Sequence, residues 1–352
     1  MLKRLKVEDF TVFQSAKFEF GALNVIHGEN STGKTHVLRL GYSLLACLAP
    51  GPNETAPERP TKGWMETHAG PKLVGVFRPE DDKIGRLSRR VHGTKTTRVS
   101  AVLGSNDRFA FSFSTRSESV VKVEEVPKSW IERPPVFLPT RELLSVYPGF
   151  ASLYETQAIP FDETWRDTCV LLGAPVSRGP KKQEIARLLE PLERSIGCKA
   201  SLEGGRFFVQ MTNPPARIEA DLVAEGFRKL TMVARLIANG SLDDGGYVFW
   251  DEPDANLNPR LVKGLAPLLL DLAAGGLQVF VATHSLFLMR ELEIVQRERG
   301  DSVDVRYFGL HPAPNGQGVE LMQGASIDES GDLAALDETL EQSNRFLELV
   351  TR

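Results

Sequence analysis

The alternation of apolar and polar positions predicts a strand-rich N-terminal part of the chain. Residues 2–26 alternate in this way, which predicts two or three strands, the last of them buried at residues 23–26. A helical apolar run follows at residues 36–49. Between residues 73 and 126, short β-like runs recur between turn signals and predict an antiparallel meander. Residues 50–72 are rich in proline, glycine and polar residues and are expected to form a surface loop.

The pattern changes twice more along the chain. Residues 134–143 predict a buried strand that ends in a charged turn. From there to about residue 240 the periodicity is helical, with a hairpin-like interruption at residues 200–211. From residue 246 onward, apolar runs of strand length alternate with helical segments, and the last segment is an amphipathic helix. Such alternation is typical of a parallel sheet covered by helices on both faces.

These elements predict an α/β fold with a mostly parallel sheet, an antiparallel β side-sheet and an inserted helical subdomain. We divide the chain into three parts on this basis. Residues 1–140 form an N-terminal lobe, residues 141–240 the helical subdomain and residues 241–352 a C-terminal lobe.

The composition is that of an ordinary globular protein. The 352 residues carry 42 Lys and Arg against 46 Asp and Glu, a formal net charge of -4, so nothing global indicates nucleic-acid binding. The three cysteines lie far apart and fit neither a zinc site nor a disulfide framework. No window has the length of a membrane span or the pattern of a signal peptide. We therefore expect a soluble, cytoplasmic protein without a membrane partner.

One local stretch, residues 86–98, is strongly basic. Cations in this stretch could contact the phosphate backbone of double-stranded DNA, and the candidates are Arg86, Arg89, Arg90, Lys95 and Arg98. Binding of this kind weakens steeply with salt, because counterions are released from the nucleic acid. The alternative is that the stretch forms the solvated face of a hairpin.

A glycine-rich motif, GENSTGKT at residues 28–35, lies between the predicted buried strand and the helical run. Strand, glycine loop and helix form the context of a phosphate-binding loop. Glycines allow backbone angles that turn successive N–H groups towards one anion, and the helix N-terminus adds the positive end of its dipole. We expect Lys34 to reach the terminal phosphates of a nucleotide and the Thr35 hydroxyl to bind Mg2+. The predicted nucleotide-binding residues are Gly28, Asn30, Ser31, Thr32, Gly33, Lys34, Thr35 and His36.

Two adjacent acids follow the buried run YVFW at residues 247–250. The end of a buried parallel strand lies at the sheet edge where ligands bind in open α/β folds. We predict that Asp251 holds Mg2+, directly or through water, and that Glu252 polarises the attacking water. His284 follows the next buried strand and is predicted to hydrogen-bond the terminal phosphate. The alternatives are a solvated acidic turn and a structural histidine.

The motifs GENSTGKT, FWDEPDANLNP and VATHS, with residues 1–28 in front, resemble those of ABC-type ATPases of the SMC and RecF-like branch. The closest likeness is to AAA-type bacterial ATP-binding proteins related to the OLD-family nucleases. The resemblance covers roughly residues 1–45 and 220–310. It implies a P-loop NTPase fold of ABC type that binds ATP and Mg2+.

The resemblance also implies a homodimer in which two subunits sandwich two ATP molecules, with residues 254–259 as a dimer contact. A signature loop of the opposite subunit then caps each phosphate, and residues 222–230 are the candidate, through Glu225 and Gly226. Ala224 stands where the family usually carries a serine, so one hydroxyl contact to phosphate is missing. Arg141 is the candidate for the family's glutamine-loop position.

Several functions are compatible with such an ATPase. Our leading hypothesis is a nucleotide-dependent dimeric switch, in phage defence or DNA repair, that controls DNA binding or a separate effector protein such as a nuclease or toxin. We expect the effector on another polypeptide, because the segment after His284 is too short for the nuclease domain of OLD proteins. The alternatives are the ATPase subunit of a membrane transporter and the ATPase component of a translation-targeting toxin system.

Overall fold

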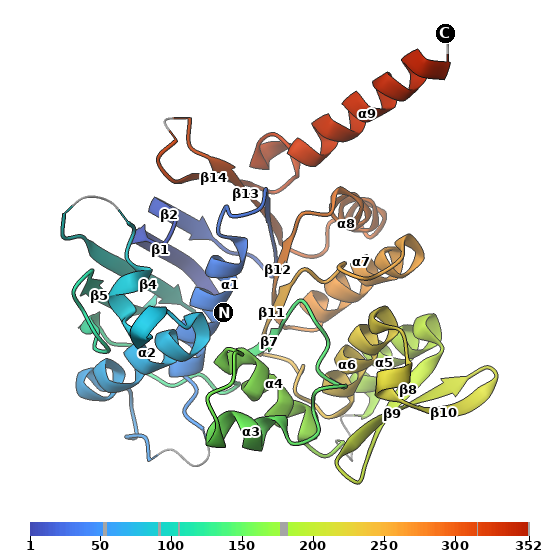
Figure 1. Ribbon diagram of the computed structural model, residues 1–352, viewed down its shortest axis with the longest axis horizontal. Coiled ribbons are helices and arrows are strands. Elements are labelled where there is room, and N and C mark those ends of the chain that lie inside the picture. The colour runs from blue at the N-terminus through green and yellow to red at the C-terminus, as the bar shows by residue number, and fades with distance from the viewer. Residues whose placement is uncertain (52–54, 91–92, 105, 177–181, 315, 351–352) are drawn as a thin grey trace.

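A six-stranded, mostly parallel sheet runs through the centre of the protein (Figure 1). The computed structural model describes residues 1–51, 55–90, 93–104, 106–176, 182–314 and 316–350. The strand order is β14-β13-β3-β12-β11-β7, and β14 alone runs antiparallel to its neighbour in this sheet. The strands are β3 (Leu23–Gly28), β7 (Val136–Leu138), β11 (Tyr247–Asp251), β12 (Gln278–Thr283), β13 (Val305–Pro312) and β14 (Val319–Gly324).

The central strands are apolar on both faces because both faces are covered. In β11, Val248 and Trp250 pack into one hydrophobic core, whereas Tyr247 and Phe249 pack into the other. Every residue of β11 and β12 is buried. Strands of this kind read as continuous apolar runs rather than alternating ones, which is why the sequence marked them clearly.

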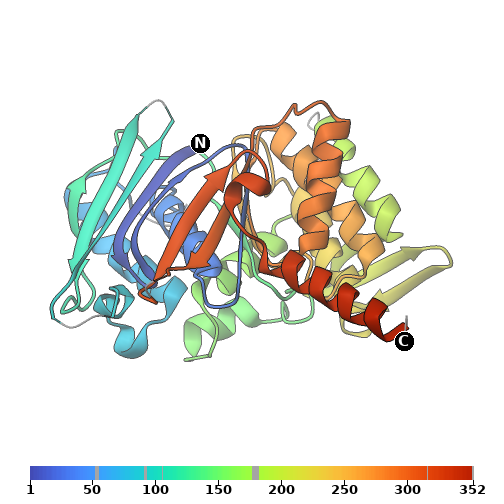
Figure 2. The same cartoon turned by 90° about the horizontal axis from the view of Figure 1, so that it is seen from above.

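One face of the central sheet is covered by two helices and a five-stranded antiparallel sheet (Figure 2). This side-sheet has the order β2-β1-β4-β5-β6. It confirms the predicted antiparallel side-sheet and takes in the first two strands of the chain. The elements are β1 (Leu2–Phe10), β2 (Phe13–Glu19), β4 (Thr96–Leu103), β5 (Asp107–Ser114), β6 (Lys122–Glu125), α1 (Lys34–Cys47), α2 (Lys62–Phe77), and the 3-10 helices η1 (Glu80–Asp82) and η2 (Ile84–Leu87).

The prediction of a surface loop over residues 50–72 holds for the described residues up to 61, but from residue 62 onward it was wrong, as was the strand predicted directly after it. Residues 62–77 form the single helix α2, whose N-terminus is capped by the Thr61 side chain; residues 52–54 lie outside the described part of the chain. Met65, Ala69, Leu73 and Val76 are buried at helical spacing in the core that the side-sheet shares. This packing outweighs the β propensity of the run KLVGVF and the internal Pro71.

Helices cover the opposite face of the central sheet (Figure 1). Between β7 and β11, helices predominate as predicted, but residues 198–219 form a three-stranded sheet, β10-β9-β8, instead of a hairpin. Its third strand lies in a stretch that we had predicted to be helical. The elements are α3 (Phe150–Thr156), α4 (Glu163–Gly173), α5 (Lys182–Ile196), β8 (Cys198–Glu203), β9 (Arg206–Thr212), β10 (Pro215–Glu219), η3 (Ala220–Leu222), α6 (Glu225–Ala238), α7 (Pro259–Ala274) and α8 (Leu286–Glu298).

The C-terminal helix extends away from the rest of the molecule (Figure 1). This helix, α9 (Ala334–Val350), follows the short helix η4 (Asp328–Ser330). Across the ranges that the structure describes, no helix combines the length and apolarity that crossing a membrane requires. The three-part division at residues 140 and 240 stays a prediction, although the central sheet draws strands from the first and third parts.

Candidate functional site

The carboxyl ends of three neighbouring parallel strands bring the predicted site residues to one edge of the sheet. Strand β12 pairs with β11 on one side and with β3 on the other. The registers align Asp251 with Ala282, and Thr283 with His27. The phosphate-binding loop, the two acids and His284 therefore leave the sheet at the same level, as ligand-binding segments do in open α/β folds.

The phosphate-binding loop has the backbone geometry that the motif predicts. Gly28 and Gly33 have positive φ values of 144° and 94°. A Cβ atom at Gly28 would lie 2.4 Å from the Leu310 carbonyl oxygen, and one at Gly33 would lie 2.7 Å from a Val12 methyl group. Both positions therefore require glycine. Helix α1 begins directly after the loop, at Lys34, so its N-terminal amide groups are available to an anion.

The Lys34 side chain is hydrogen-bonded to the backbone of the phosphate-binding loop. Its Nζ donates hydrogen bonds to the carbonyl oxygens of Gly28 and Glu29, each at 2.9 Å. Burial lowers the pKa of this ammonium group, and the charges of Glu252 and Asp251 oppose that shift. The lysine thus lies among the groups that the sequence assigned to phosphate and metal.

Thr35 and Asp251 meet as the predicted metal pair. The Thr35 hydroxyl donates a hydrogen bond to the Asp251 carboxylate, 3.0 Å from Oδ2 and 3.1 Å from Oδ1. Burial is the main reason that the pKa of Asp251 is raised; the Thr35 hydrogen bond opposes this, and the Glu252 charge adds to it. Mg2+ prefers oxygen ligands and would favour the ionised carboxylate, so this donor pair fits the ion.

Glu252 and His284 form a second pair at the same edge. His284 Nδ1 lies 2.7 Å from Glu252 Oε2, and the histidine is exposed while the glutamate is largely buried. The Glu252 backbone has a φ of 48°, in the left-handed region, and its amide donates to the Ala282 carbonyl oxygen at 2.8 Å. Strained backbone of this kind clusters at functional sites, where surrounding contacts hold it in place.

A cleft of about 1160 Å³ opens beside the phosphate-binding loop. The loop contributes Asn30, Ser31 and Thr32, and helix α1 contributes His36. Burial, with a smaller effect of Arg39, lowers the pKa of His36 to about 4, so its ring is neutral at pH 7. Phe77 also lines the cleft, and its ring centroid lies 5.9 Å from that of His36.

The basic stretch divides between two places. Arg86, Arg89 and Arg90 line the cleft beside the phosphate-binding loop. Arg98 is exposed on β4, where its Nη1 lies 3.6 Å from a Glu8 carboxylate oxygen. Lys95 is half-buried and does not line this cleft. Of the three, Arg86 forms an ion pair with Glu80, and the buried Arg89 donates a hydrogen bond to the Gln317 carbonyl oxygen at 2.7 Å.

The predicted signature loop packs against its own subunit. Glu225 and Gly226 begin helix α6, and a Cβ atom at Gly226 would lie 2.7 Å from the Asn256 carbonyl oxygen. Gly226 therefore allows α6 to approach the segment after Glu252. Neither residue lines the cleft that the described residues form. Their contact with a second subunit stays a prediction.

Sequence reasoning missed two charged side chains of α6. Arg228 Nε lies 2.7 Å from a carboxylate oxygen of buried Glu142, whereas the neighbouring Arg141, our glutamine-loop candidate, is exposed. Lys229 is 1% exposed and donates to the carbonyl oxygens of Glu252 and Ala255. In the sequence, Lys229 stands four positions after Glu225, a spacing typical of solvent-exposed helix pairs, so the pattern gave no sign of burial.

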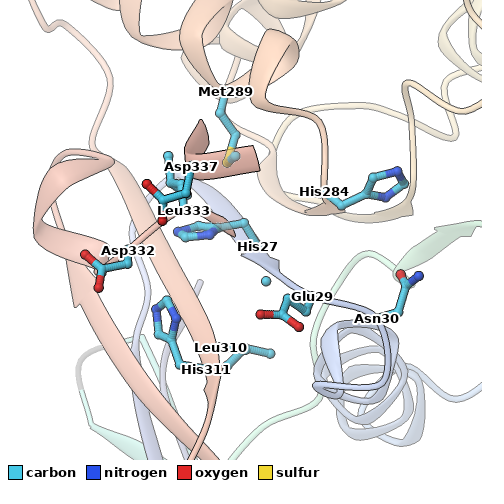
Figure 3. A pocket seen from close by; sticks show the side chains of 11 residues that line it. His27, Glu29, Asn30, His284, Met289, Leu310, His311, Asp332, Leu333 and Asp337 are labelled. Carbon is cyan, nitrogen blue, oxygen red and sulfur yellow. The ribbon is translucent and has the colours of Figure 1, made fainter. Parts of the chain in front are cut away.

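A cavity of about 550 Å³ adjoins the other side of the phosphate-binding loop (Figure 3). Glu29, Asn30 and His284 line it together with the segment that leads into α9. His27 is buried next to it, and its Nε2 lies 2.6 Å from the Ser330 hydroxyl. Burial lowers the pKa of His27 to about 4, with smaller effects of His311 and Lys34, so the neutral ring anchors η4 to the strand before the loop.

Comparison with solved structures shows which architecture this is. The chain is similar to a structure described as "Crystal structure of the SmcHead bound to the C-winged helix domain of ScpA", with 12% identity and a TM-score of 0.54 over 93% of this chain and 98% of that one. The fold is that of an SMC head domain. An SMC head domain with an extended coiled coil, bound to the C-terminal domain of ScpA derived from Pyrococcus furiosus, is similar at 11% identity and a TM-score of 0.53, over 100% and 99% of the chains.

The sequence comparisons cover a smaller part of the chain than the structural ones. Residues 139–290 match the family described as "AAA domain, putative AbiEii toxin, Type IV TA system". The match includes Asp251, Glu252 and His284 but not the phosphate-binding loop. The sequence matches none of the curated proteins with which it was compared. These findings support the predicted ABC/SMC type of ATPase fold, while the closeness to OLD-family proteins stays a prediction.

Proposed function

We propose that this protein binds and hydrolyses Mg-ATP. The observation that carries the proposal is the hydrogen bond from Thr35 to Asp251 at the mouth of the phosphate-binding loop, with the Glu252–His284 pair on the adjoining strands. Phosphoryl transfer depends mainly on positioning and charge neutralisation, and these groups supply both. The fold shared with SMC head P-loop ATPase domains supports the same function.

Each residue has a distinct role in this proposal. The amide groups of residues 28–35 and the Lys34 ammonium hold the phosphates, and the arginines of the cleft neutralise further negative charge. Thr35 and Asp251 hold Mg2+, which neutralises phosphate charge when bound. Glu252 orients the attacking water and accepts its proton, and His284 holds the Glu252 carboxylate and contacts the terminal phosphate.

We further propose that ATP closes a homodimer and hydrolysis opens it. A Glu252→Gln variant should bind ATP, hydrolyse it about 10²- to 10⁴-fold more slowly, and elute as a dimer with ATP and Mg2+. Glu203→Gln, in the exposed β8–β9 hairpin, changes charge equally and should behave like the unmodified protein. A Glu252→Gln protein that binds ATP but stays monomeric would contradict the dimeric switch.

The switch is proposed to control a separate effector protein, or DNA, in phage defence or DNA repair. The partner of the similar SMC heads is a protein domain, which favours a protein partner. The ATPase rate with and without double-stranded DNA separates the two. Stimulation that disappears in an Arg98→Ala, Lys95→Ala variant supports DNA, whereas an unchanged rate and no binding support a protein effector.

A second candidate is the ATPase component of a toxin system. The description of the family that matches residues 139–290 favours it. Expression of the chain with and without its neighbouring genes tests this function. Growth arrest that depends on Lys34 and is relieved by a neighbouring gene supports it, and normal growth in both cases contradicts it.

A further inference from the structure

A buried lysine on α6 donates hydrogen bonds to the backbone of the segment that begins with Glu252. Lys229 is 1% exposed, and its Nζ donates to the Glu252 carbonyl oxygen at 2.7 Å and to the Ala255 carbonyl oxygen at 3.1 Å. Lysine is almost never fully buried unless its charge has partners. Here the hydrogen-bond partners are two backbone carbonyls of a single short segment, residues 252–255.

This segment has a backbone conformation that needs support. Glu252 and Asn256 have positive φ values of 48° and 63°, and neither is a glycine. Such residues cost free energy and persist where surrounding contacts determine their conformation. On the side of β12, the Thr283 hydroxyl donates to Asp254 Oδ1 at 2.6 Å. Lys229 supplies the support on the side of α6.

Helix α6 touches the same segment at a second point. A Cβ atom at Gly226, three residues before Lys229, would lie 2.7 Å from the Asn256 carbonyl oxygen. Positions three apart lie on one face of a helix, so this face of α6 and residues 252–256 form a continuous contact.

We propose that Lys229 is a positioning residue for hydrolysis. It holds residues 252–255 so that the Glu252 carboxylate stays beside His284. In this way Lys229 also links the position of α6 to that of the carboxylate. The inference rests on the proposed function. Lys229 is not among the described residues that line the cleft, and its hydrogen bonds go to the segment after β11. It acts on the chemical step through Glu252 and leaves ATP binding to other groups.

Arg235 offers a matched control on the same helix. It is 6% exposed and also donates to two backbone carbonyl oxygens, those of Leu172 at 3.2 Å and Ala174 at 2.8 Å. These carbonyls belong to the end of α4 and not to the segment after β11. Arg235→Met and Lys229→Met therefore both remove a buried cation of α6, but only the second releases Glu252.

The test compares the two variants and Lys229→Arg, which keeps the charge and the donors. We expect Lys229→Met to lower kcat about 10²-fold at an unchanged Kd for ATP, because a misplacement of about 1 Å has this effect on catalytic groups. Arg235→Met should keep kcat, and Lys229→Arg should restore most of it. In a Glu252→Gln background, Lys229→Met should have no further effect on kcat.

Hydrogen exchange gives a readout that does not depend on hydrolysis. Lys229→Met should speed amide exchange in residues 252–257, and Arg235→Met should not. If the unmodified protein does not hydrolyse ATP, the proposed function fails. The difference in amide exchange would still show that Lys229 stabilises the backbone of residues 252–255. Equal effects of the two Met variants on kcat and exchange, or a Lys229→Met protein with normal kcat, overturn the inference. If Lys229→Met does not fold, Lys229→Gln takes its place with the same criteria.

Discussion

The hydroxyl of Thr35 donates a hydrogen bond to the carboxylate of Asp251, although the two residues lie 216 positions apart. The contact joins the first turn of α1 to the end of β11. Because α1 begins within the phosphate-binding motif, this contact sets the oxygen atoms of both residues beside the place where the terminal phosphates are expected. The positions proposed for the metal and for the phosphates therefore lie in one site.

Replacing Asp251 by asparagine should abolish stabilisation by Mg-ATP without destabilising the nucleotide-free protein. Burial raises the pKa of Asp251 in the folded protein, so the ionised carboxylate lowers the free energy of unfolding at pH values above the raised pKa. In the absence of nucleotide, Asp251→Asn should therefore melt at the same temperature as the unmodified protein or higher. Mg-ATP should raise the Tm of the unmodified protein but not that of the variant. A lower Tm without nucleotide would contradict this account.

Gly33→Ala should destabilise both the fold and the nucleotide site. The residue has a φ of 94°, and its added methyl group would lie 2.7 Å from a Val12 methyl carbon. We expect a loss of about 1–3 kcal/mol in unfolding free energy, with weaker ATP binding. Gly63→Ala is the control, because that glycine lies in α2 with open space around it. Urea titrations and ATP binding of the two variants give the comparison.

Lys72→Met should disrupt a buried ion cluster between α2 and α4. Lys72 Nζ lies 2.7 Å from Asp167 and 2.9 Å from Glu163. Asp167 also accepts a hydrogen bond from Tyr42 of α1, so the cluster connects α4 to the helix of the phosphate-binding loop. Removing the cation takes away the ion-pair partner of Glu163 and leaves Asp167 with Arg166 and Tyr42 only, at about 3–5 kcal/mol.

The control for Lys72 lies on the same helix. Lys62 is exposed and 3.9 Å from Glu66, so Lys62→Met should cost about 1 kcal/mol or less. Equal unfolding free energies of the two variants would show that the buried cluster adds nothing to stability.

The arginines of the cleft should act on ATP. Arg89→Ala and Arg90→Ala each remove a cation from the wall beside residues 30–32, and we expect each to weaken ATP binding about tenfold, the effect of a lost charge-assisted hydrogen bond. Arg98→Ala on β4 should leave ATP binding unchanged. Calorimetric titrations at two salt concentrations measure this. Equal ATP affinities of all three variants would contradict a role of the cleft arginines in ATP binding and leave DNA binding as their predicted role.

Activity and stability should change in opposite directions above pH 8. Burial lowers the pKa of Lys229 to about 8 from 10.5, while the charges of Asp254, Glu225, Glu252 and Asp251 oppose the shift. Above pH 8 the folded protein holds a neutral amine, which binds the Glu252 and Ala255 carbonyls more weakly, so kcat/KM should fall. Over the same range the free energy of unfolding should gain from this group, because the cost of burying the ammonium disappears. In Lys229→Arg, the fall in kcat/KM should vanish.

The strands that form the site were predictable because each is a continuous apolar run followed directly by a polar or glycine-rich motif. YVFW runs into Asp251 and Glu252, LNVI runs into the glycine loop, and VFVAT runs into His284. Helix α2 was not predictable in this way. Its apolar spacing also fits short strands, and only burial against the side-sheet decides between them.

The phosphate-binding loop, the buried strands around it and the candidate roles of Lys34, Asp251 and Glu252 could be predicted from the sequence, because motif spacing and apolar periodicity are local properties. Only the packing of the chain brings Arg89 and Arg90 to the cleft beside the phosphate-binding loop, and buries Lys229 with hydrogen bonds to the carbonyl oxygens of Glu252 and Ala255. These contacts join segments far apart along the chain. Their partners are set by how helices and sheets pack, and no local pattern encodes that packing.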